Sequence, residues 1–497
     1  MNKIIIHISN EVKVVYAETN DNLLQVLRNN KIYISSPCGG RGVCNKCLVK
    51  LINENKYEKA CQITISKDME IEIISNKGEG LHNYTNKSTQ GEKKNSYGLC
   101  VDIGTTTLAI YLIDSNQLIV RDSKSCLNPQ SSYGADVISR ISACIQGRLE
   151  ELQTIIIDVI NEAIIDFTNM YSINEIDNVY IAANPIMLHI VAKKSPITLG
   201  YAPYTPLFLD LIEVTGESLG IKASRVLLMP SISSFIGSDI TMGLISSNII
   251  NDSCSILIDF GTNGEMVLKH NKKYFAVSTA TGPAFEGANI TMGMGGVEGA
   301  INRVQIIDEK LCLSTVLGEP KGIAGSGLID IIGILLNIGL IDEYGAFNYE
   351  SNHFLKEYLN DEKFYLSENI YITQSDIRQF QLAKSAIKSG ILTLFNYAQL
   401  EVEEIEKVYI AGGFGFYLDY ANAVTTGIIP HNFLGKIIPL GNASGQGLIE
   451  CMLEEKNILI ATTIAKTVQV IELTNNKTFS EYFIENMIFK KDDIYED

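Results

Sequence analysis

Positive charge is scarce in this chain. Its 497 residues include 40 Lys and Arg side chains against 57 Asp and Glu, which leaves a formal net charge of −17 at pH 7. Binding to a phosphate backbone needs an excess of cations, so this balance argues against nucleic acid as a partner. At 46% hydrophobic residues, the chain is still long and apolar enough to form several compact units.

Long hydrophobic runs are also missing. The longest apolar stretch, residues 331–341, is too short to span a bilayer. The first residues lead directly into a predicted strand and lack the pattern of a secretory leader. We therefore expect a cytoplasmic protein without a membrane partner.

The chain lacks a P-loop as well. The pattern Gly-x4-Gly-Lys-Ser/Thr does not occur anywhere in the sequence. This excludes one large class of nucleotide-binding folds, so any ATP site must use another kind of phosphate-binding turn.

Four cysteines near the start have the spacing of a ferredoxin-type [2Fe-2S] site. Three of them lie in one short glycine-rich loop, where backbone N–H groups can approach the sulfides, and the fourth comes from a separate segment. A zinc site is the main alternative, but four-thiolate zinc sites usually have two Cys-x2-Cys pairs, and unliganded thiols are the remaining alternative. The predicted ligands are Cys38, Cys44, Cys47 and Cys61.

The residues around these cysteines predict a β-grasp ferredoxin domain over residues 1–75. Residues 4–8 and 12–16 have the pattern of paired strands, and residues 20–30 that of a short helix. Residues 76–96 are almost entirely polar, which predicts a flexible linker. We expect the ferredoxin domain to move on this linker.

Two kinds of segment recur in the remaining chain. Residues 101–107 are similar to residues 258–265, and both predict a hairpin; residues 179–185 are similar to residues 408–415, and both predict a strand followed by a helix. This order predicts two related α/β lobes that face each other across a cleft, at residues 97–252 and 253–497. The expected fold is therefore multidomain α+β and α/β, with a two-lobed nucleotide-binding region after the ferredoxin domain.

The repeated hairpins carry the chemistry expected of phosphate-binding turns. In an Asp-x-Gly-Thr turn, the glycine leaves room for phosphate and the following N–H groups and hydroxyls can donate to its oxygens. The carboxylates of Asp102 and Asp259 are candidates to hold hydrated Mg²⁺ or to orient water. One such turn alone is more often an ordinary hairpin, but two of them with a Gly-Gly junction favour nucleotide binding. The residues of that junction expected to pack against adenine or ribose are Gly412, Gly413, Phe414 and Gly415.

These motifs resemble the phosphate-1, phosphate-2 and adenosine motifs of the acetate kinase/sugar kinase/Hsp70/actin superfamily. Joined to a [2Fe-2S] domain, the resemblance narrows to the reductive activators of corrinoid proteins, which use ATP to reduce a Co(II) corrinoid to Co(I). It covers nearly the whole chain. Further segments that look like this family are residues 128–130, 134–140, 184–189, 282–287 and 325–330.

The resemblance implies a [2Fe-2S] cluster, ATP and Mg²⁺ as cofactors. The implied partners are a corrinoid protein of a methyltransferase system and an external low-potential electron donor, and a homodimer is one possible assembly. ATP binding would close the two lobes and favour the complex with the corrinoid protein. The phosphate contacts that the resemblance implies are Gly104, Thr105, Thr106, Gly261, Thr262 and Asn263.

The chain departs from the family pattern in two places. Larger members carry a structured linker domain where this chain has residues 76–96, so a dimer contact through such a domain is not expected. Archaeal-type relatives carry further clusters near the C-terminus, whereas no cysteine follows Cys451 here. We expect one cluster only.

Three features have two interpretations each. Glu265 either polarises the hydrolytic water or simply starts a strand, and His189 is more often a satisfied core residue than a group that meets a partner. Residues 282–287 either contact nucleotide or dock a partner. For the whole chain, the alternatives to reductive activation are a kinase-like phosphotransferase with a redox-sensing cluster and a plain electron carrier.

Overall fold

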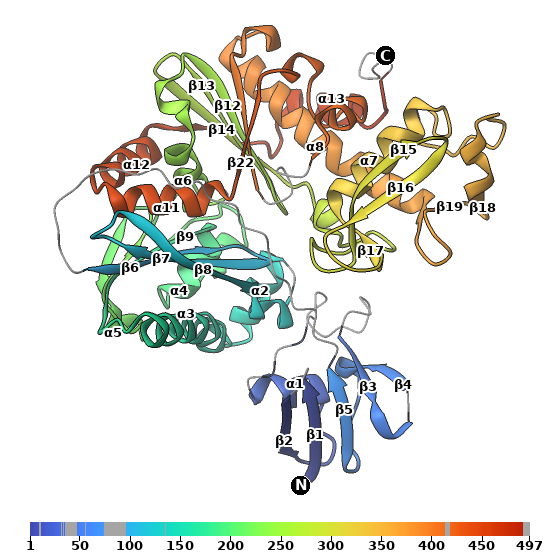
Figure 1. Cartoon of the computed structure of the whole chain (residues 1–497). Helices are drawn as coiled ribbons and strands as arrows, with labels where there is room; N and C mark the ends of the chain where they lie inside the picture. The colour runs from blue at the N-terminus through green and yellow to red at the C-terminus, as the bar shows by residue number, and fades with distance from the viewer. Residues whose placement is uncertain are drawn as a thin grey trace. The chain divides into compact units, whose positions relative to one another are not determined.

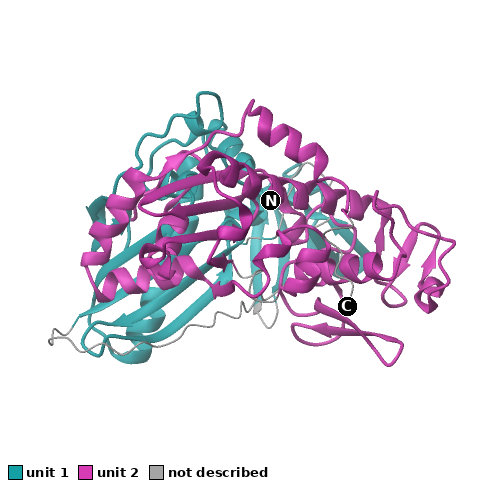
Figure 2. Ribbon diagram, turned by 90° about the horizontal axis from the view of Figure 1, so that it is seen from above, with its two compact units in different colours: residues 1–78, 89–228 teal, residues 79–88, 229–497 magenta. Residues whose placement is uncertain are grey.

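The computed structural model describes residues 1–8, 11–30, 32, 34, 47–54, 56–73, 96–134, 136–412 and 418–490. The chain divides into two compact units (Figure 2): residues 1–78 with 89–228, and residues 79–88 with 229–497. The predicted linker, residues 76–96, lies outside the described residues except for Ser96. The predicted domain limits at residues 75, 96 and 252 remain predictions.

The first sheet belongs to the predicted ferredoxin domain and has the order β2-β1-β5-β3-β4. Its first two strands pair antiparallel, with Ile4 opposite Val15, and a short helix packs its leucines into the same core. The Asn22 side chain begins that helix by accepting a hydrogen bond from the Gln25 N–H. The two predicted strands and the helix are confirmed. The elements are β1 (Asn2–Ile8), β2 (Glu11–Ala17), α1 (Leu23–Asn29), β3 (Leu48–Leu51), β4 (Lys56–Lys59) and β5 (Met69–Ile73).

The rest of the first unit is a six-stranded sheet, order β10-β11-β9-β6-β7-β8, with helices packed on it (Figure 1). Apolar residues recur along the long helix α3 and bury one face of it in the core of this sheet. The elements are β6 (Tyr97–Ile103), β7 (Thr107–Asp114), β8 (Ile119–Leu127), the 3₁₀ helix η3 (Pro129–Ser132), α2 (Val137–Ile145), α3 (Leu149–Tyr171), β9 (Ile176–Ala183), α4 (Pro185–Val191), β10 (Ile212–Thr215), α5 (Gly216–Leu219) and β11 (Ala223–Leu228).

The second unit contains a further six-stranded sheet, order β22-β21-β12-β13-β14-β23, and two three-stranded sheets. The strands of its larger sheet are β12 (Cys254–Phe260), β13 (Gly264–His270), β14 (Lys273–Thr279), β21 (Lys407–Ala411), β22 (Ile437–Gly441) and β23 (Gln469–Val470). Helices of the same unit are α6 (Ser238–Ser246), α10 (Tyr420–Thr425), α11 (Ala443–Leu453) and α12 (Lys456–Thr467). The two small sheets are formed by β15 (Ala300–Ile307), β16 (Lys310–Thr315) and β17 (Gly322–Ile323), and by β18 (Leu359–Asn360), β19 (Lys363–Tyr365) and β20 (Tyr371–Thr373). Further helices of this unit are the 3₁₀ helix η6 (Pro283–Glu286), α7 (Gly325–Asn337), α8 (Gln374–Ala398) and α13 (Lys477–Glu485).

The two large sheets share a core of three strands with the same pairing. In one, β6 runs parallel to β9 and antiparallel to β7; in the other, β12 runs parallel to β21 and antiparallel to β13. The register is the same too, because Asp102 lies opposite Ala182 and Asp259 lies opposite Ala411. The repeats in the sequence therefore correspond to two copies of one strand arrangement.

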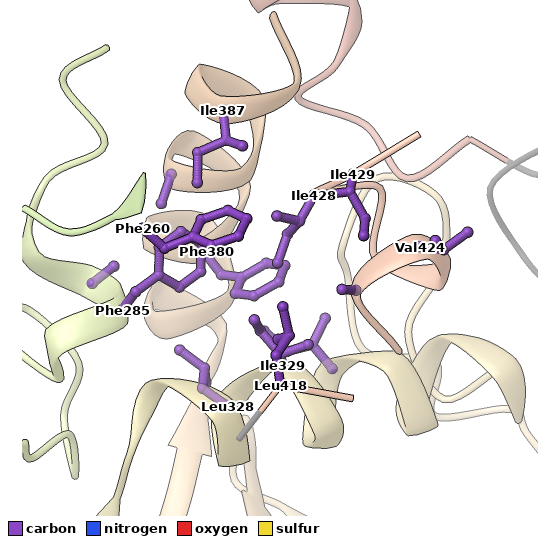
Figure 3. Packing of buried hydrophobic residues seen from close by; sticks show 14 of the residues in the cluster. Phe260, Phe285, Leu328, Ile329, Phe380, Ile387, Leu418, Val424, Ile428 and Ile429 are labelled. Atoms are coloured by element: carbon purple, nitrogen blue, oxygen red, sulfur yellow. The ribbon is translucent and has the colours of Figure 1, made fainter. Parts of the chain in front are cut away.

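The core of the second unit is built mainly from β12, α7 and α8. Phe285 and Phe380 meet edge to face with ring centroids 5.8 Å apart, and Leu328 and Ile329 of α7 point toward the same cluster (Figure 3). The first part of the apolar stretch at residues 331–341 thus belongs to the largely buried helix α7, which ends at Asn337. Within the described part of the chain, no helix has the length and apolar character needed to cross a membrane.

Candidate functional site

The second predicted phosphate turn connects β12 to β13 in the second unit. The Gly261 N–H donates to the Asn263 carbonyl at 3.0 Å, which closes a short turn over residues 261–263. Asp259 was expected at the turn itself, but it lies within β12, paired with Glu265 of β13. The two carboxylates therefore come from facing strands, just before and just after the glycine turn.

A third carboxylate, that of Asp239, interacts with this pair. Asp239 lies in the first turn of α6, and its charge together with that of Asp259 raises the pKa of Glu265. Burial is the larger cause, although part of Glu265 is still reached by solvent, and the Asn263 side chain opposes the shift by a hydrogen bond. The pKa of Glu265 is consequently held well above its ordinary value. Such a carboxylate accepts a proton more readily than an exposed glutamate does.

Sequence reasoning missed Asp239. It stands far from both repeated hairpins in the chain, and a single Asp in the first turn of a helix is an ordinary feature that favours the helix dipole. One feature of the sequence could have pointed to Asp239. The residues Gly237-Ser238-Asp239 are typical of the start of a helix, and they come shortly before the second hairpin. Only the packing of α6 beside β12 brings this side chain to Glu265.

The loop at residues 282–287 contacts this turn. The Thr262 hydroxyl donates to the Glu286 carboxylate at 2.8 Å. Thr281, the residue before this loop, also contacts the turn. Its hydroxyl donates to the Thr262 carbonyl at 2.8 Å and lies 3.1 Å from the Gly261 carbonyl oxygen. The loop therefore belongs to the support of the phosphate turn, which favours the nucleotide interpretation over partner docking.

Gly412 follows β21 beside Asp259. Its φ of +91° lies in the left-handed region, and a Cβ atom there would lie 3.1 Å from Asp259 Oδ1 and 3.1 Å from the Phe260 carbonyl oxygen. A side chain at this position would thus displace the carboxylate. The other residues predicted for the adenosine motif, Gly413, Phe414 and Gly415, lie outside the described residues.

The first predicted phosphate turn connects β6 to β7 in the first unit. The Gly104 N–H donates to the Thr107 carbonyl at 2.9 Å, and a Cβ on Gly104 would lie 2.8 Å from that same oxygen. Glycine is therefore required by the close approach of the backbone. Asp102, again expected at the turn, lies within β6 opposite Ala109.

Side chains from three later elements bind the backbone carbonyls and one hydroxyl of this turn. Asn128 Nδ2 donates to the Gly104 carbonyl at 2.8 Å, and the fully buried Arg140 donates to the Thr105 carbonyl. Asn184 Nδ2 donates to Thr105 Oγ1 at 3.3 Å. With its carbonyls occupied in this way, the turn can offer its N–H groups to an anion.

Two of the four predicted cluster cysteines are described. The Ala60 N–H donates to the Cys47 carbonyl at 2.8 Å, which joins the segment of Cys47 to that of Cys61. Cys47 is buried, Cys61 is partly buried, and both are free thiols. Cys38 and Cys44 lie outside the described residues. The described pair fits a shared ligand set, because its members come from two segments joined side by side.

His189 is a satisfied core residue. Its Nδ1 lies 2.7 Å from the Pro185 carbonyl oxygen, its Nε2 accepts from the Leu207 N–H at 3.0 Å, and its ring stacks on Phe208. These partners require a proton on Nδ1 and none on Nε2. Burial lowers the pKa of His189 and so favours the neutral ring.

Comparison with known proteins finds a matching family model for each of the three parts of the chain. Residues 6–69 match the model of a 2Fe-2S iron-sulfur cluster binding domain, residues 97–252 that of the RACo middle region, and residues 253–496 that of the C-terminal domain of RACo, the ASKHA domain. The corrinoid activation enzyme RamQ of Eubacterium limosum is 33% identical over 429 residues, covering 80% of this chain and 71% of the relative. The reductase of a methylated-amine-specific Co(II) corrinoid protein of Methanosarcina barkeri is 25% identical over 432 residues, covering 78% and 76%.

A solved structure agrees with these matches. The reductive activator for a corrinoid, iron-sulfur protein superposes with a TM-score of 0.72 at 27% identity and covers 98% of both chains. The likeness thus extends over the ferredoxin domain and both lobes. From the cysteine spacing, the two matching sheets and these relatives we conclude that the chain belongs to the RACo family, with a [2Fe-2S] ferredoxin domain joined to an ASKHA-type nucleotide-binding region.

Proposed function

We propose that this chain is an ATP-dependent reductive activator of a corrinoid protein. It passes one electron to Co(II) of the bound corrinoid, which becomes Co(I) and is competent again for methyl transfer. The observation that carries this proposal is the presence, on one chain, of ferredoxin cysteines and of a phosphate turn flanked by the paired carboxylates of Asp259 and Glu265. The RamQ enzyme and the corrinoid protein reductase, whose names state these activities, support it.

The cluster would be held by Cys47 and Cys61 together with the two loop cysteines, and it would supply single-electron transfer at low potential. Within the ferredoxin core, Cys47 is 1% exposed. The protein therefore shields this ligand from water and from oxidants. The electron itself would come from an external low-potential donor.

Each phosphate turn, taken by itself, offers its backbone N–H groups and hydroxyls to phosphate. The carboxylates that would hold hydrated Mg²⁺ lie beside the turns: Asp102 in the first unit and Asp259 in the second. Mg²⁺ commonly keeps several waters and uses one or two protein carboxylates. The remaining charge of the phosphates is met by the turns.

Glu265 takes a proton from the attacking water. Its pKa is raised by burial and by Asp239 and Asp259, so the carboxylate is a better proton acceptor than an exposed glutamate. Asn263 donates a hydrogen bond to it and fixes its direction. Asp239 acts on the reaction through Glu265 and is a positioning residue.

ATP is required because the electron transfer is uphill. Plant-type clusters have reduction potentials of about −400 mV. For each 59 mV by which the potential of the acceptor lies below that of the cluster, the equilibrium constant for one-electron transfer falls about tenfold. ATP binding changes the affinity of the chain for the corrinoid protein and favours a complex in which cobalt is easier to reduce. Hydrolysis then resets the chain.

Anaerobic EPR spectroscopy tests the proposal. Cluster-loaded protein, a mild reductant and a candidate corrinoid protein are mixed with and without Mg-ATP, and the Co(II) signal is followed. We expect ATP-dependent loss of the signal, absent in Asp259→Asn but present in the matched control Asp361→Asn, which changes an exposed acid of the same unit. Loss of the signal that is equally fast without ATP would contradict the proposal. Phosphorylation of a small molecule by protein without the cluster would favour the kinase alternative.

A further inference from the structure

Arg28 reaches from the ferredoxin domain into the first lobe. It stands in the last turn of α1 and is only 9% exposed. Its guanidinium donates to the Ser132 carbonyl and lies 4.6 Å from the centroid of the Tyr133 ring. The planar guanidinium thus combines a hydrogen bond with a cation–π contact, two interactions that a lysine ammonium does not reproduce together.

A second arginine completes this contact from the side of the lobe. The guanidinium of Arg148 lies 5.8 Å from the centroid of the same Tyr133 ring, and its Nη1 donates to Gln25 Oε1 of α1 at 3.1 Å. The Tyr133 hydroxyl donates to Glu151 at 3.0 Å. The Glu151 carboxylate thereby offsets part of the positive charge that the two arginines bring to one ring.

The residues that receive Arg28 are continuous with the first phosphate turn. Asn128 begins η3, which ends at Ser132, and the Asn128 N–H donates to the Thr106 carbonyl at 2.7 Å while its Nδ2 donates to the Gly104 carbonyl at 2.8 Å. Asn128, Gln130 and Ser132 are fully buried. One short and closely packed segment therefore contacts the phosphate turn at its start and Arg28 at its end.

The helix that carries Arg28 also contacts a predicted cluster segment. At the start of α1, Asn22 Nδ2 donates to the Cys61 carbonyl at 2.9 Å. Helix α1 thus joins the segment of a predicted ligand to the segment that supports the phosphate turn.

From this arrangement we infer that Arg28, Tyr133 and Arg148 form a docking surface for the chain's own ferredoxin domain, and that nucleotide at residues 104–106 strengthens the docking. The second part rests on the proposed function, since it requires phosphate at that turn. The coupling element is the segment from Asn128 to Tyr133.

The expected direction follows from hydrogen-bond polarisation. When the N–H groups of the turn donate to phosphate, the carbonyls of the same peptide units become better acceptors. Asn128 donates to two of these carbonyls, so its position is fixed more firmly when phosphate is bound. Because Asn128 begins η3 and Ser132 ends it, the Ser132 carbonyl that accepts from Arg28 is then fixed in position as well. Because coupling between binding events is reciprocal, a docked ferredoxin domain must also tighten nucleotide binding by the same factor.

Hydrogen-exchange mass spectrometry of the cluster-loaded chain tests both parts. The variants are Arg28→Ala, Arg28→Lys and, on the lobe, Tyr133→Leu; the control is Lys67→Ala, which removes an exposed cation of the same ferredoxin domain. Cluster absorbance and circular dichroism report whether each variant is folded. We expect Arg28→Ala to speed exchange at residues 129–134 and Tyr133→Leu to speed exchange at residues 23–30, each in the part of the chain that was not changed.

The nucleotide arm uses a non-hydrolysable ATP analogue with Mg²⁺. In the unchanged protein it should slow exchange at residues 102–106 and also at residues 23–30. Arg28→Ala and Arg28→Lys should weaken the affinity for the analogue by about fivefold or more, the lower end of usual allosteric couplings, although Arg28 does not contact the turn. Lys67→Ala should leave the affinity unchanged.

The outcomes separate this inference from the proposed function. Protection of residues 102–106 with no change at residues 23–30, or unchanged affinity in the Arg28 variants, overturns the coupling and leaves ATP binding intact. Absence of protection at residues 102–106 overturns nucleotide binding at this turn and the coupling together. Unchanged exchange at residues 129–134 in a folded Arg28→Ala protein overturns the docking surface itself.

Discussion

Asp259 lies directly opposite Glu265 in the β12–β13 pair, whereas the equivalent Asp102 of the other large sheet lies opposite Ala109. The two sheets otherwise share the register of their central strands. The hairpins therefore share a carboxylate suited to Mg²⁺, but only the second adds a facing acid. This asymmetry is the reason that we propose Glu265, in the second unit, as the acceptor of the proton.

Replacing Glu265 by Gln should slow ATP hydrolysis while nucleotide binding is retained. The amide keeps the shape of the side chain but cannot accept the proton of water, and a general base typically contributes about 10²- to 10⁴-fold. Steady-state phosphate release and the dissociation constant of a non-hydrolysable analogue measure the two effects. Glu319→Gln, at an exposed position of the same unit, is the matched control. An equal loss of affinity and rate would indicate a structural role instead.

The pH dependence of hydrolysis should report the environment of Glu265. Because its pKa is raised, the rate should fall with decreasing pH well above pH 4.5, as the carboxylate gains a proton. Asp239→Asn removes a neighbouring negative charge, so it should lower the pKa of Glu265 and move this acidic limb to lower pH. The limb should be absent from the residual rate of Glu265→Gln. A limb that stays in place in Asp239→Asn would contradict the assignment of Asp239.

Gly412→Ala should destabilise the second unit and weaken nucleotide binding. A φ of +91° is unfavourable for alanine by about 1–2 kcal/mol, and the added methyl group would press against Asp259. Thermal unfolding and analogue binding measure these losses. Gly295→Ala is a suitable control, since a Cβ there would have no neighbour within 4 Å. Equal behaviour of the two variants would show that the position of Gly412 is unimportant.

Cys47→Ser and Cys61→Ser should each abolish the visible absorption of the cluster and lower the iron content. Serine is a poor substitute for a thiolate ligand of iron. Cys312→Ser, which changes a partly exposed free cysteine of the second unit, should retain both signals. Metal analysis of the unchanged chain decides the remaining alternative, because one zinc ion and no iron would identify a zinc site.

The neutral form of His189 should make stability depend on pH. Its pKa is lowered in the folded state from an ordinary value of 6.5, so the unfolded chain takes up a proton at higher pH than the folded chain does. The free energy of unfolding should therefore fall as the pH drops below 6.5 and toward the folded pKa. His189→Leu should remove this contribution and lower stability at pH 8 by about 1–3 kcal/mol, because it leaves buried partners unpaired. Chemical denaturation across pH measures both, and His270→Leu, at a partly exposed position, is the control.

Much of the fold could be predicted from local patterns. The first two strands, the helix after them and both repeated hairpins were expected near the observed positions, because each depends on residues close in sequence. The two aspartates were placed at the turns but lie inside the strands, since hairpin pairing continues beyond the last alternating residue. The two pairs of similar segments in the sequence also predicted that the two large sheets would be related.

The sequence by itself determined the two kinds of chemistry, because cysteine spacing and glycine turns are local requirements of a cluster and of phosphate. Only the tertiary structure decided which side chains act together. Packing of α6 beside β12 brings Asp239 to Glu265, and packing of α1 against η3 brings Arg28 to Tyr133. Such neighbours are distant in the chain and ordinary in their own segments. Their chemistry arises from burial and from the charges that the fold places around them.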